Sequence, residues 1–122
     1  MKKIKTVISL GDLYDRISIL NVKLTMIPDQ DAINNVAKEL SELMGALSKS
    51  DHIFDVEHMK QLQIINRTLW DLETNVRRKL TDKEFICTAK EIFAMNDKRA
   101  EVKRTINLWN KSNIVEEKYH SE

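Results

Sequence analysis

Residues 10–29 read LGDLYDRISILNVKLTMIPD, and this stretch decides the fold. Its large apolar residues recur at alternating steps of three and four, the spacing that places side chains on one face of an α-helix. Ser9 precedes the stretch as a helix N-cap, with Asp12 in the first turn. Pro28 cannot continue the backbone hydrogen-bond ladder, and Asp29 can cap a following helix. The stretch therefore predicts one long amphipathic helix that ends before Pro28.

The composition of the 122-residue chain agrees with an all-α protein. Two Gly and one Pro leave few of the residues that tight turns and strand bends require, which disfavours an all-β fold. The two glycines lie far apart in the sequence, which excludes the glycine-rich phosphate-binding loops of dinucleotide-binding and P-loop proteins. The length suits a single domain over residues 1–122.

Three more helices follow with the same spacing of apolar residues. We expect the second over residues 33–47, the third from a cap at Asp51 to about residue 79, and the fourth from a capping box at Thr81 and Glu84 to about residue 109. Short loops predict antiparallel neighbours, so the expected architecture is an antiparallel bundle of about four helices. A C-terminal tail, residues 112–122, follows the fourth helix, and we expect its residues 112–119 to pack on this bundle.

Charge and cysteine content limit the partners and the compartment. Twenty basic and nineteen acidic residues give a formal net charge of +1, so no overall field draws the chain to nucleic acid or to an anionic membrane. No run of residues approaches the ~20 apolar residues of a membrane-spanning helix. The single cysteine, Cys87, suits a reducing compartment and is expected to be a small core residue. We therefore predict a cytoplasmic protein without membrane or nucleic-acid partners.

Polar residues interrupt the apolar stripes of the third and fourth helices. On the third helix they are Asn66 and Glu73; on the fourth they are Asn96, Arg99 and Lys103. On the first helix, Asp12, Arg16 and Lys23 lie on a strip beside the leucines. An unpaired buried charge costs several kcal/mol, so inward cations need partners, and Glu73 and Asp12 are the expected ones.

Two interpretations of this polar line remain open. It can be a structural network that fixes how the helices pack, because buried ion pairs specify register. It can also be a pocket in which Arg99 and Lys103 hold an anionic ligand while Asn66 and Asn96 orient it. Arginine suits a carboxylate or phosphate because its planar guanidinium can donate two parallel hydrogen bonds.

Several segments resemble those of a small family of uncharacterised helical proteins from bacteria and marine phages. They are residues 9–17, residues 66–73, an N-D-x-R-A motif at residues 96–100, and an E-E-K motif at residues 116–118. The resemblance covers nearly the whole chain and implies no known activity. It implies that the polar residues matter, and it adds Glu116 and Glu117 as candidate partners of Arg99 or Lys103.

Candidate metal sites are incomplete. Glu39 and Glu42 have the spacing of the first carboxylate pair in all-α nucleoside triphosphate pyrophosphohydrolases, but no second pair follows, which favours a solvated face. Glu117 and His120 form a single Glu-x-x-His, whereas a di-iron bundle needs two. A third group, at the start of the third helix, is expected to lie on the surface: His52, Asp55 and His58. We therefore predict no metal ion and no cofactor.

Two further functions have weaker support in the sequence. Residues 13–24 faintly resemble the first helix of chorismate mutases, whose inward arginines and lysines hold a dicarboxylate. A basic strip near Trp70 and Trp109 could contact nucleic acid, but interleaved acidic residues dilute it.

The leading hypothesis is a non-enzymatic binding or assembly module with a polar cleft between helices, suited to a small anionic ligand. The candidate ligand-binding residues are Asp12, Arg16, Asn66, Glu73, Asn96, Arg99, Lys103, Glu116 and Glu117. The alternative is a pyrophosphohydrolase-like or mutase-like enzyme acting on an anionic metabolite, with three cations stabilising charge and Glu73 as acid or base. Apolar residues near the C-terminus predict a homodimer: Trp109, Ile114 and Val115.

Overall fold

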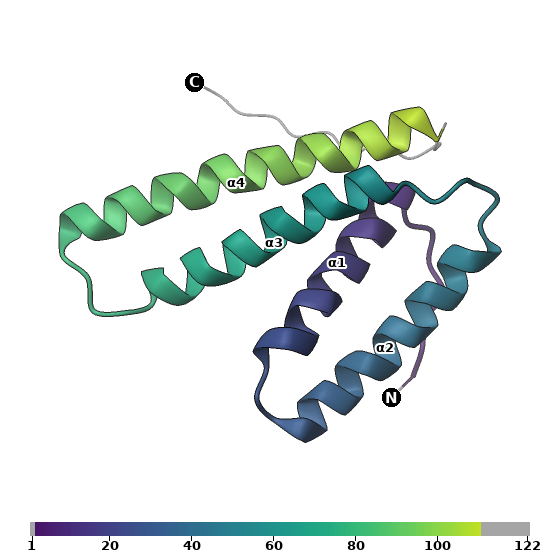
Figure 1. The fold of residues 1–122 in the computed structure, drawn as a ribbon, viewed down its shortest axis with the longest axis horizontal. Coiled ribbons are helices and arrows are strands. Elements are labelled where there is room, and N and C mark those ends of the chain that lie inside the picture. Colours follow the sequence, from purple (N-terminus) through teal and green to yellow (C-terminus); the bar gives the residue numbers. More distant parts are fainter. Residues whose placement is uncertain (1, 111–122) are drawn as a thin grey trace.

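Four helices form an all-α, bundle-like fold in the computed structural model, which describes residues 2–110. They are α1 (Leu10–Met26), α2 (Gln30–Lys49), α3 (Val56–Val76) and α4 (Asp82–Trp109). Figure 1 shows two helical hairpins, α1/α2 and α3/α4, that meet at an angle. Helix α1 packs against each of the other three, whereas α2 contacts only α1 among the described helices. The predicted fold class is confirmed; the predicted packing of the tail falls outside the described residues.

Each helix begins at a polar side chain that accepts a hydrogen bond from a backbone N–H of the first turn. Ser9 caps α1, Asp29 caps α2, and Thr81 caps α4 in a capping box with Glu84, all as predicted. The cap of α3 is Asp55, so the prediction of a cap at Asp51 is wrong.

The late start of α3 follows from its contacts with Tyr14, a fully buried residue of α1. The hydroxyl oxygen of Tyr14 accepts a hydrogen bond from the Asp55 backbone N–H at 2.9 Å. The Tyr14 ring stacks on Phe54, with the ring centroids 5.5 Å apart. These contacts hold the chain before Asp55 out of the helical conformation, so α3 begins at Val56.

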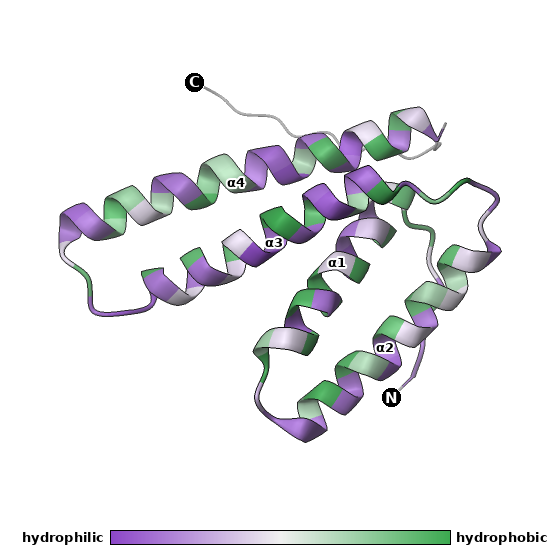
Figure 2. Cartoon of the chain, in the orientation of Figure 1, coloured by the Kyte–Doolittle hydropathy of each residue, from purple (hydrophilic) through white to green (hydrophobic). Residues whose placement is uncertain are grey.

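The core is centred on α1, because the other three helices surround it. Its buried residues are Gly11, Leu13, Tyr14, Asp15, Ile17, Ser18, Leu20 and Val22. The main apolar cluster joins α1 residues such as Ile17 to Leu62 of α3 and Ile106 of α4. Figure 2 shows hydrophobic positions distributed along the length of α1. Buried positions thus occupy most of the circumference of α1, not one stripe.

The α3/α4 hairpin extends beyond α1 (Figure 1), and we call residues 74–95 the outer arm. Among the described helices, each has only the other as a close neighbour there, and several α4 side chains are exposed. Phe85, Ile86 and Phe93 are exposed by 50%, 51% and 69%. Cys87 is also exposed, so the prediction of a core cysteine is wrong.

At the start of α1, Gly11 lies directly against α4. A Cβ added there would lie 2.5 Å from the Lys103 carbonyl oxygen and 2.9 Å from Asn107 Oδ1. The Gly11 N–H, which has no partner within its own helix, donates to Asn107 Oδ1 at 2.7 Å. The close approach of the two backbones therefore requires glycine at this position.

We predict that Gly11→Ala lowers the free energy of unfolding by about 1–3 kcal/mol, because the methyl group would meet backbone atoms that cannot rotate away. Gly45→Ala is the matched control: no atom lies within 4 Å of its added Cβ, and it lies inside α2. The control should raise stability by about 0.5–1 kcal/mol through helix propensity. Urea unfolding of both variants tests this, and a Gly11→Ala protein as stable as wild type would contradict the packing of α1 on α4.

Candidate functional site

A polar cluster built around Asp15 joins α1, α3 and α4. The Asp15 side chain is buried, and Arg99 donates to both of its oxygens, from Nε at 2.9 Å and from Nη2 at 2.5 Å. Asn66 Nδ2 donates to Asp15 Oδ1 at 2.9 Å and to Ser18 Oγ at 2.6 Å. Ser18 Oγ donates in turn to the Asp15 carbonyl oxygen at 2.7 Å. We call these four residues the Asp15 cluster; its hydrogen bonds compensate the buried carboxylate.

A second ion pair connects α1 and α4. Lys103 Nζ lies 2.9 Å from Asp12 Oδ1, and the Lys103 side chain is almost completely buried. The sequence indicated Asp12 as a partner for an inward cation, and the structure has this pair. The expected pairing of Arg99 or Lys103 with Glu73 is wrong in the described residues: Arg99 bonds to Asp15, and Glu73 is exposed.

Other candidate residues lie away from the Asp15 cluster. Arg16 is exposed, because it lies on the one side of α1 that no helix covers. Asn96 is half-buried and does not line the recess that opens beside the Asp15 cluster. Glu116 and Glu117 lie outside the described residues.

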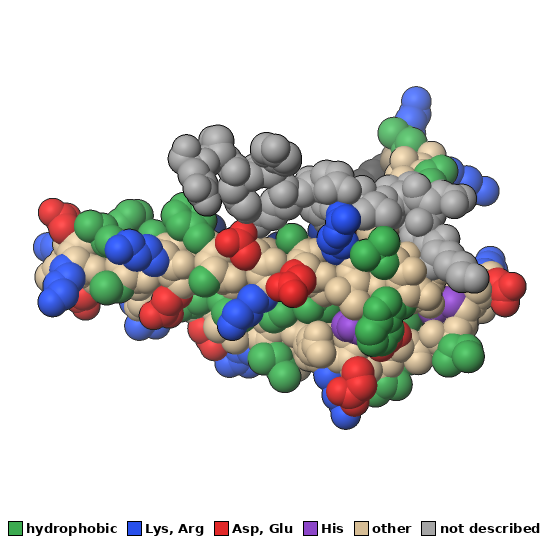
Figure 3. Space-filling model, turned by 90° about the horizontal axis from the view of Figure 1, so that it is seen from above, with side chains coloured by type: hydrophobic (Ala, Val, Ile, Leu, Met, Phe, Trp, Pro, Cys, Tyr) green, Lys and Arg blue, Asp and Glu red, His purple; other side chains and the backbone are tan. Residues whose placement is uncertain are grey.

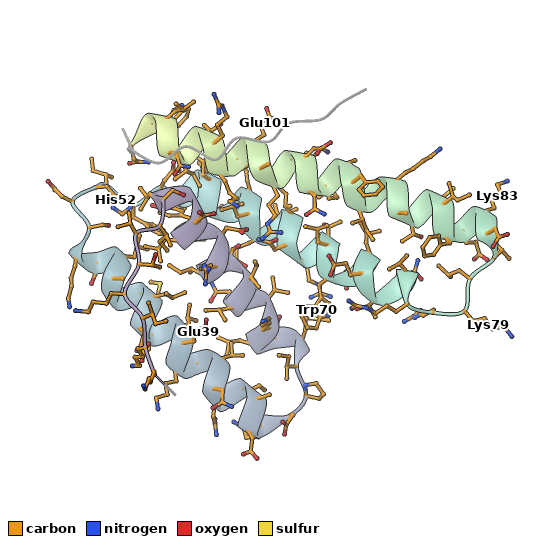
Figure 4. The ribbon with its side chains drawn as sticks, turned by 180° about the vertical axis from the view of Figure 1, so that it is seen from behind. Glu39, His52, Trp70, Lys79, Lys83 and Glu101 are labelled. Carbon is orange, nitrogen blue, oxygen red and sulfur yellow. The ribbon has the colours of Figure 1, made fainter. Side chains whose placement is uncertain are left out.

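A recess of about 200 Å³ opens beside the Asp15 cluster, and we call it the cleft. Its lining residues are Ile19, Val22, Lys23, Asn66, Leu69, Trp70, Glu73 and Arg99. The structure thus brings together three of the predicted residues: Asn66, Glu73 and Arg99. Figure 4 shows Trp70 on the side of α3 that faces the end of α1. The cleft therefore combines an aromatic and apolar wall with two cations, one carboxylate and one amide.

A second polar network surrounds Tyr14 at the other end of α1. Because the Tyr14 hydroxyl accepts from the Asp55 N–H, its own proton is directed to His52 Nε2, 2.9 Å away. Ser50 Oγ donates to the Leu47 carbonyl oxygen at 2.6 Å, so it accepts from His52 Nδ1 at 2.7 Å. These bonds assign the His52 ring proton to Nδ1. Burial raises the pKa of the Tyr14 hydroxyl, which stays a hydrogen-bond donor at neutral pH.

This network continues to Asp55 and His58 at the start of α3. Asp55 accepts from the His58 backbone N–H at 3.1 Å and contacts His58 Nδ1 at 2.5 Å. Burial alone would raise the pKa of Asp55, but the hydrogen bonds from the His58 backbone and ring outweigh it and lower that pKa. The His58 ring is buried against Trp109, with the ring centroids 4.6 Å apart. The prediction that His52, Asp55 and His58 are surface residues is therefore wrong.

No group of three or more His, Cys, Asp or Glu side chains within residues 2–110 is placed to hold a metal ion. Glu39 is exposed (Figure 4). Glu42 accepts a hydrogen bond from Lys3 Nζ at 2.6 Å, and this bond lowers the pKa of Glu42. The two glutamates therefore lie on a solvated face of α2. The Glu117 and His120 pair is outside the described residues.

The comparisons with known proteins identify a family but no activity. The model of a family of unknown function (DUF6165) matches residues 4–122. No curated protein and no solved structure shows a significant match to the chain. In the described part of the chain, none of the helices has the length and apolar content needed to cross a membrane.

We predict that Arg99→Ala lowers the free energy of unfolding by about 3 kcal/mol, because it leaves the buried Asp15 carboxylate without its main partner. Arg67→Ala is the matched control, since Arg67 pairs with Asp71 at 3.4 Å between two largely exposed side chains. Such surface pairs are worth about 0.5 kcal/mol or less. Denaturant unfolding measures both, and equal effects of the two substitutions would contradict a structural role for the Asp15 cluster.

The Asp55 contacts predict a dependence of stability on acid pH. Because the folded-state pKa of Asp55 lies below the unfolded one, its contribution is complete above about pH 4 and is lost as the pH falls through the folded-state pKa. Asp55→Asn keeps a capping side chain but removes this titratable carboxyl group. The free energy of unfolding of the variant should therefore fall less steeply than that of the wild type between about pH 4 and 2. Asp51→Asn, at an exposed position of the preceding loop, is the control. Identical pH profiles for wild type and Asp55→Asn, followed by thermal unfolding, would refute this assignment.

Proposed function

We propose that the protein, which belongs to this family of unknown function (DUF6165), is a non-enzymatic binding module. Its cleft takes a small anionic ligand. One observation carries the proposal: Lys23, Asn66 and Arg99 line the same recess as Trp70. Ligand sites commonly combine an apolar wall with a few polar groups that fix orientation.

Arg99 is held in position before any ligand binds. Its two hydrogen bonds to Asp15 fix the plane of the guanidinium, while 29% of its side chain stays exposed. A fixed cation loses little conformational entropy on binding, which favours affinity. Lys23, half-buried in the last turn of α1, supplies a second positive group to the cleft.

The charges of the cleft restrict the ligand further. Among the described residues, Asp15 pairs with Arg99, and Glu73 lines the same cleft as Lys23, so these two carboxylates and two cations sum to a net charge close to zero. A suitable ligand would carry one carboxylate or phosphate that pairs with the two cations, and one N–H or O–H group that donates a hydrogen bond to Glu73. The volume of about 200 Å³ is below the roughly 300–1,000 Å³ of drug-sized sites, so the ligand should be the size of an amino acid or a hydroxy acid.

The enzyme alternative has less support from the geometry. It needs three cations around one reacting group, but Arg16 is exposed elsewhere on α1 and Lys103 is buried against Asp12. Glu73 lines the cleft together with Lys23, but the described contacts include no hydrogen bond between these two groups that would couple them as an acid–base pair. A binding site therefore accounts for the arrangement with fewer requirements than a catalytic site.

Three further proposals rest on the sequence. We propose a cytoplasmic location, because a single exposed thiol, Cys87, is compatible with a reducing compartment. We propose that nucleic acid and membranes are not partners, in line with the net charge of +1. We also propose that relatives in bacteria and marine phages share the N-D-x-R-A and E-E-K motifs, since the arginine of the first motif is Arg99, the partner of Asp15.

The function is tested by melting the protein against amino acids, hydroxy acids, dicarboxylates, sugar phosphates and inorganic phosphate. A ligand present at about 100 times its Kd should add about 2.7 kcal/mol of stability. We predict that Lys23→Ala and Trp70→Ala fold normally but lose this stabilisation, because both residues line the cleft. Lys90→Ala, at an exposed position of the outer arm, is the control and should keep it.

Two outcomes would contradict the proposal: no stabilisation by any compound in the panel, or stabilisation that survives both cleft substitutions. A compound that binds is then incubated with the protein and followed by NMR. An unchanged spectrum supports a binding module, whereas new product signals would favour the enzyme alternative.

A further inference from the structure

Apolar residues of the outer arm, three of them exposed and two half-buried, form a stripe on α4 with internal symmetry. Residues 85–93 read F-I-C-T-A-K-E-I-F, so the order Phe, Ile, Ala, Ile, Phe is the same from either end. Ala89 is the centre: Phe85 and Phe93 lie four residues before and after it, and Ile86 and Ile92 lie three residues before and after it. We call these five residues the α4 stripe.

Helix geometry places the whole α4 stripe on one face. At about 100° per residue, the phenylalanines lie about 40° and the isoleucines about 60° to either side of Ala89. Thr88, about 100° away from Ala89, is buried and accepts a hydrogen bond from Asn75 Nδ2 of α3 at 3.3 Å. The face centred on Ala89 therefore lies beside the contact with α3: Ile92 is half-buried on the near side, and Ile86 and Phe93 are exposed on the far side. Figure 3 shows apolar side chains gathered along the outer part of α4.

We propose that a second copy of this chain covers the α4 stripe, with the two α4 helices antiparallel and a two-fold axis passing beside Ala89. Such an axis pairs each residue before the centre with the residue equally far after it on the other copy. Phe85 and Ile86 then share one layer with Ile92 and Phe93 of the second copy. Within this layer Phe85 lies on the same side as Ile92 of the second copy, and Ile86 on the same side as Phe93 of the second copy. The small side chain of Ala89 lies at the crossing point, where it allows the two helices to approach closely.

Charges at the edge of the α4 stripe agree with this pairing. Lys83 and Asp97 lie on the same side of α4, about 120° and 80° from Ala89. The antiparallel arrangement places Lys83 beside Asp97 of the second copy, once at each end of the interface. Lys90, also on this side, lies near the axis, so the two Lys90 side chains must extend apart into solvent.

Self-complementarity favours a second copy over a different partner. A two-fold interface needs a face that is complementary to itself. The α4 stripe meets this need, because apolar side chains lie before and after Ala89 and Lys83 lies opposite Asp97 of the second copy. The stripe is short, so the dimer should be weak and depend on concentration. The proposal is independent of the cleft, and it places the interface at the opposite end of α4 from Trp109, on which the expectation of a homodimer was based.

Light scattering over a range of protein concentrations tests the assembly. We expect the mass to rise from 14.3 kDa toward twice that value with increasing concentration. Phe93→Glu should weaken dimerisation at least about tenfold, because each copy loses a buried phenylalanine and gains a desolvated charge. Ile53→Glu is the control: Ile53 is 91% exposed, lies in the loop before α3, and should leave the mass unchanged. A wild-type mass of 14.3 kDa at every concentration would overturn the proposal.

Cross-linking then tests the orientation of the helices. In a Cys87→Ser background, Ala89→Cys places one thiol of each copy at the two-fold axis, where a disulfide or a short bismaleimide can join them. Glu91→Cys in the same background is the control, since residue 91 lies about 200° from Ala89, on the opposite face. We expect covalent dimers from Ala89→Cys and none from Glu91→Cys. Equal cross-linking by both variants, or none by Ala89→Cys, would overturn the antiparallel arrangement.

Discussion

The buried carboxylate of Asp15 is the constraint on which the arrangement of the helices depends. A carboxylate removed from water costs several kcal/mol unless cations and hydrogen-bond donors replace its hydration. Asn66 of α3 and Arg99 of α4 supply these groups from two different helices. Because the hydrogen bonds of Asn66 and Arg99 tolerate little displacement, α3 and α4 can each take only one position along α1. The apolar core alone would permit small shifts along the helix axes that this cluster forbids.

The central place of α1 explains several other features. Three helices contact it, so both apolar and polar residues are buried around most of its circumference. Gly11 allows the backbone of α4 to approach its first turn, and the pair of Asp12 and Lys103 closes the same region. Helix α2, in contrast, depends on α1 alone among the described helices. We infer that the α1/α2 hairpin and the α3/α4 hairpin are stabilised by different sets of contacts, with α1 common to both.

The fold was largely predictable from the sequence, because its signals are local. N-caps and a 3/4 spacing of apolar residues need only neighbouring residues, and they located three of the four helix starts. The site was predictable in part: Asn66 and Arg99 interrupt apolar stripes. Asp15 was missed because the prediction assumed one buried face for α1, and that assumption also made Arg16 a candidate. The Tyr14 network was missed because its hydrogen bonds span 38 and 41 residues of sequence, a distance that no spacing pattern encodes.

Residues that the fold does not need are the best guide to function in this protein. The Asp15 cluster is satisfied internally, so Asp15 and Ser18 have a structural role without any ligand. Lys23 and Trp70 have no comparable part in the described packing, yet both line the cleft beside that cluster. The outer half of α4 likewise adds nothing to the core around α1, although it carries large apolar side chains that water disfavours. Both features are explained if α1 and its buried contacts form a rigid centre, with ligand binding at the edge of this centre and self-association on the arm that projects from it.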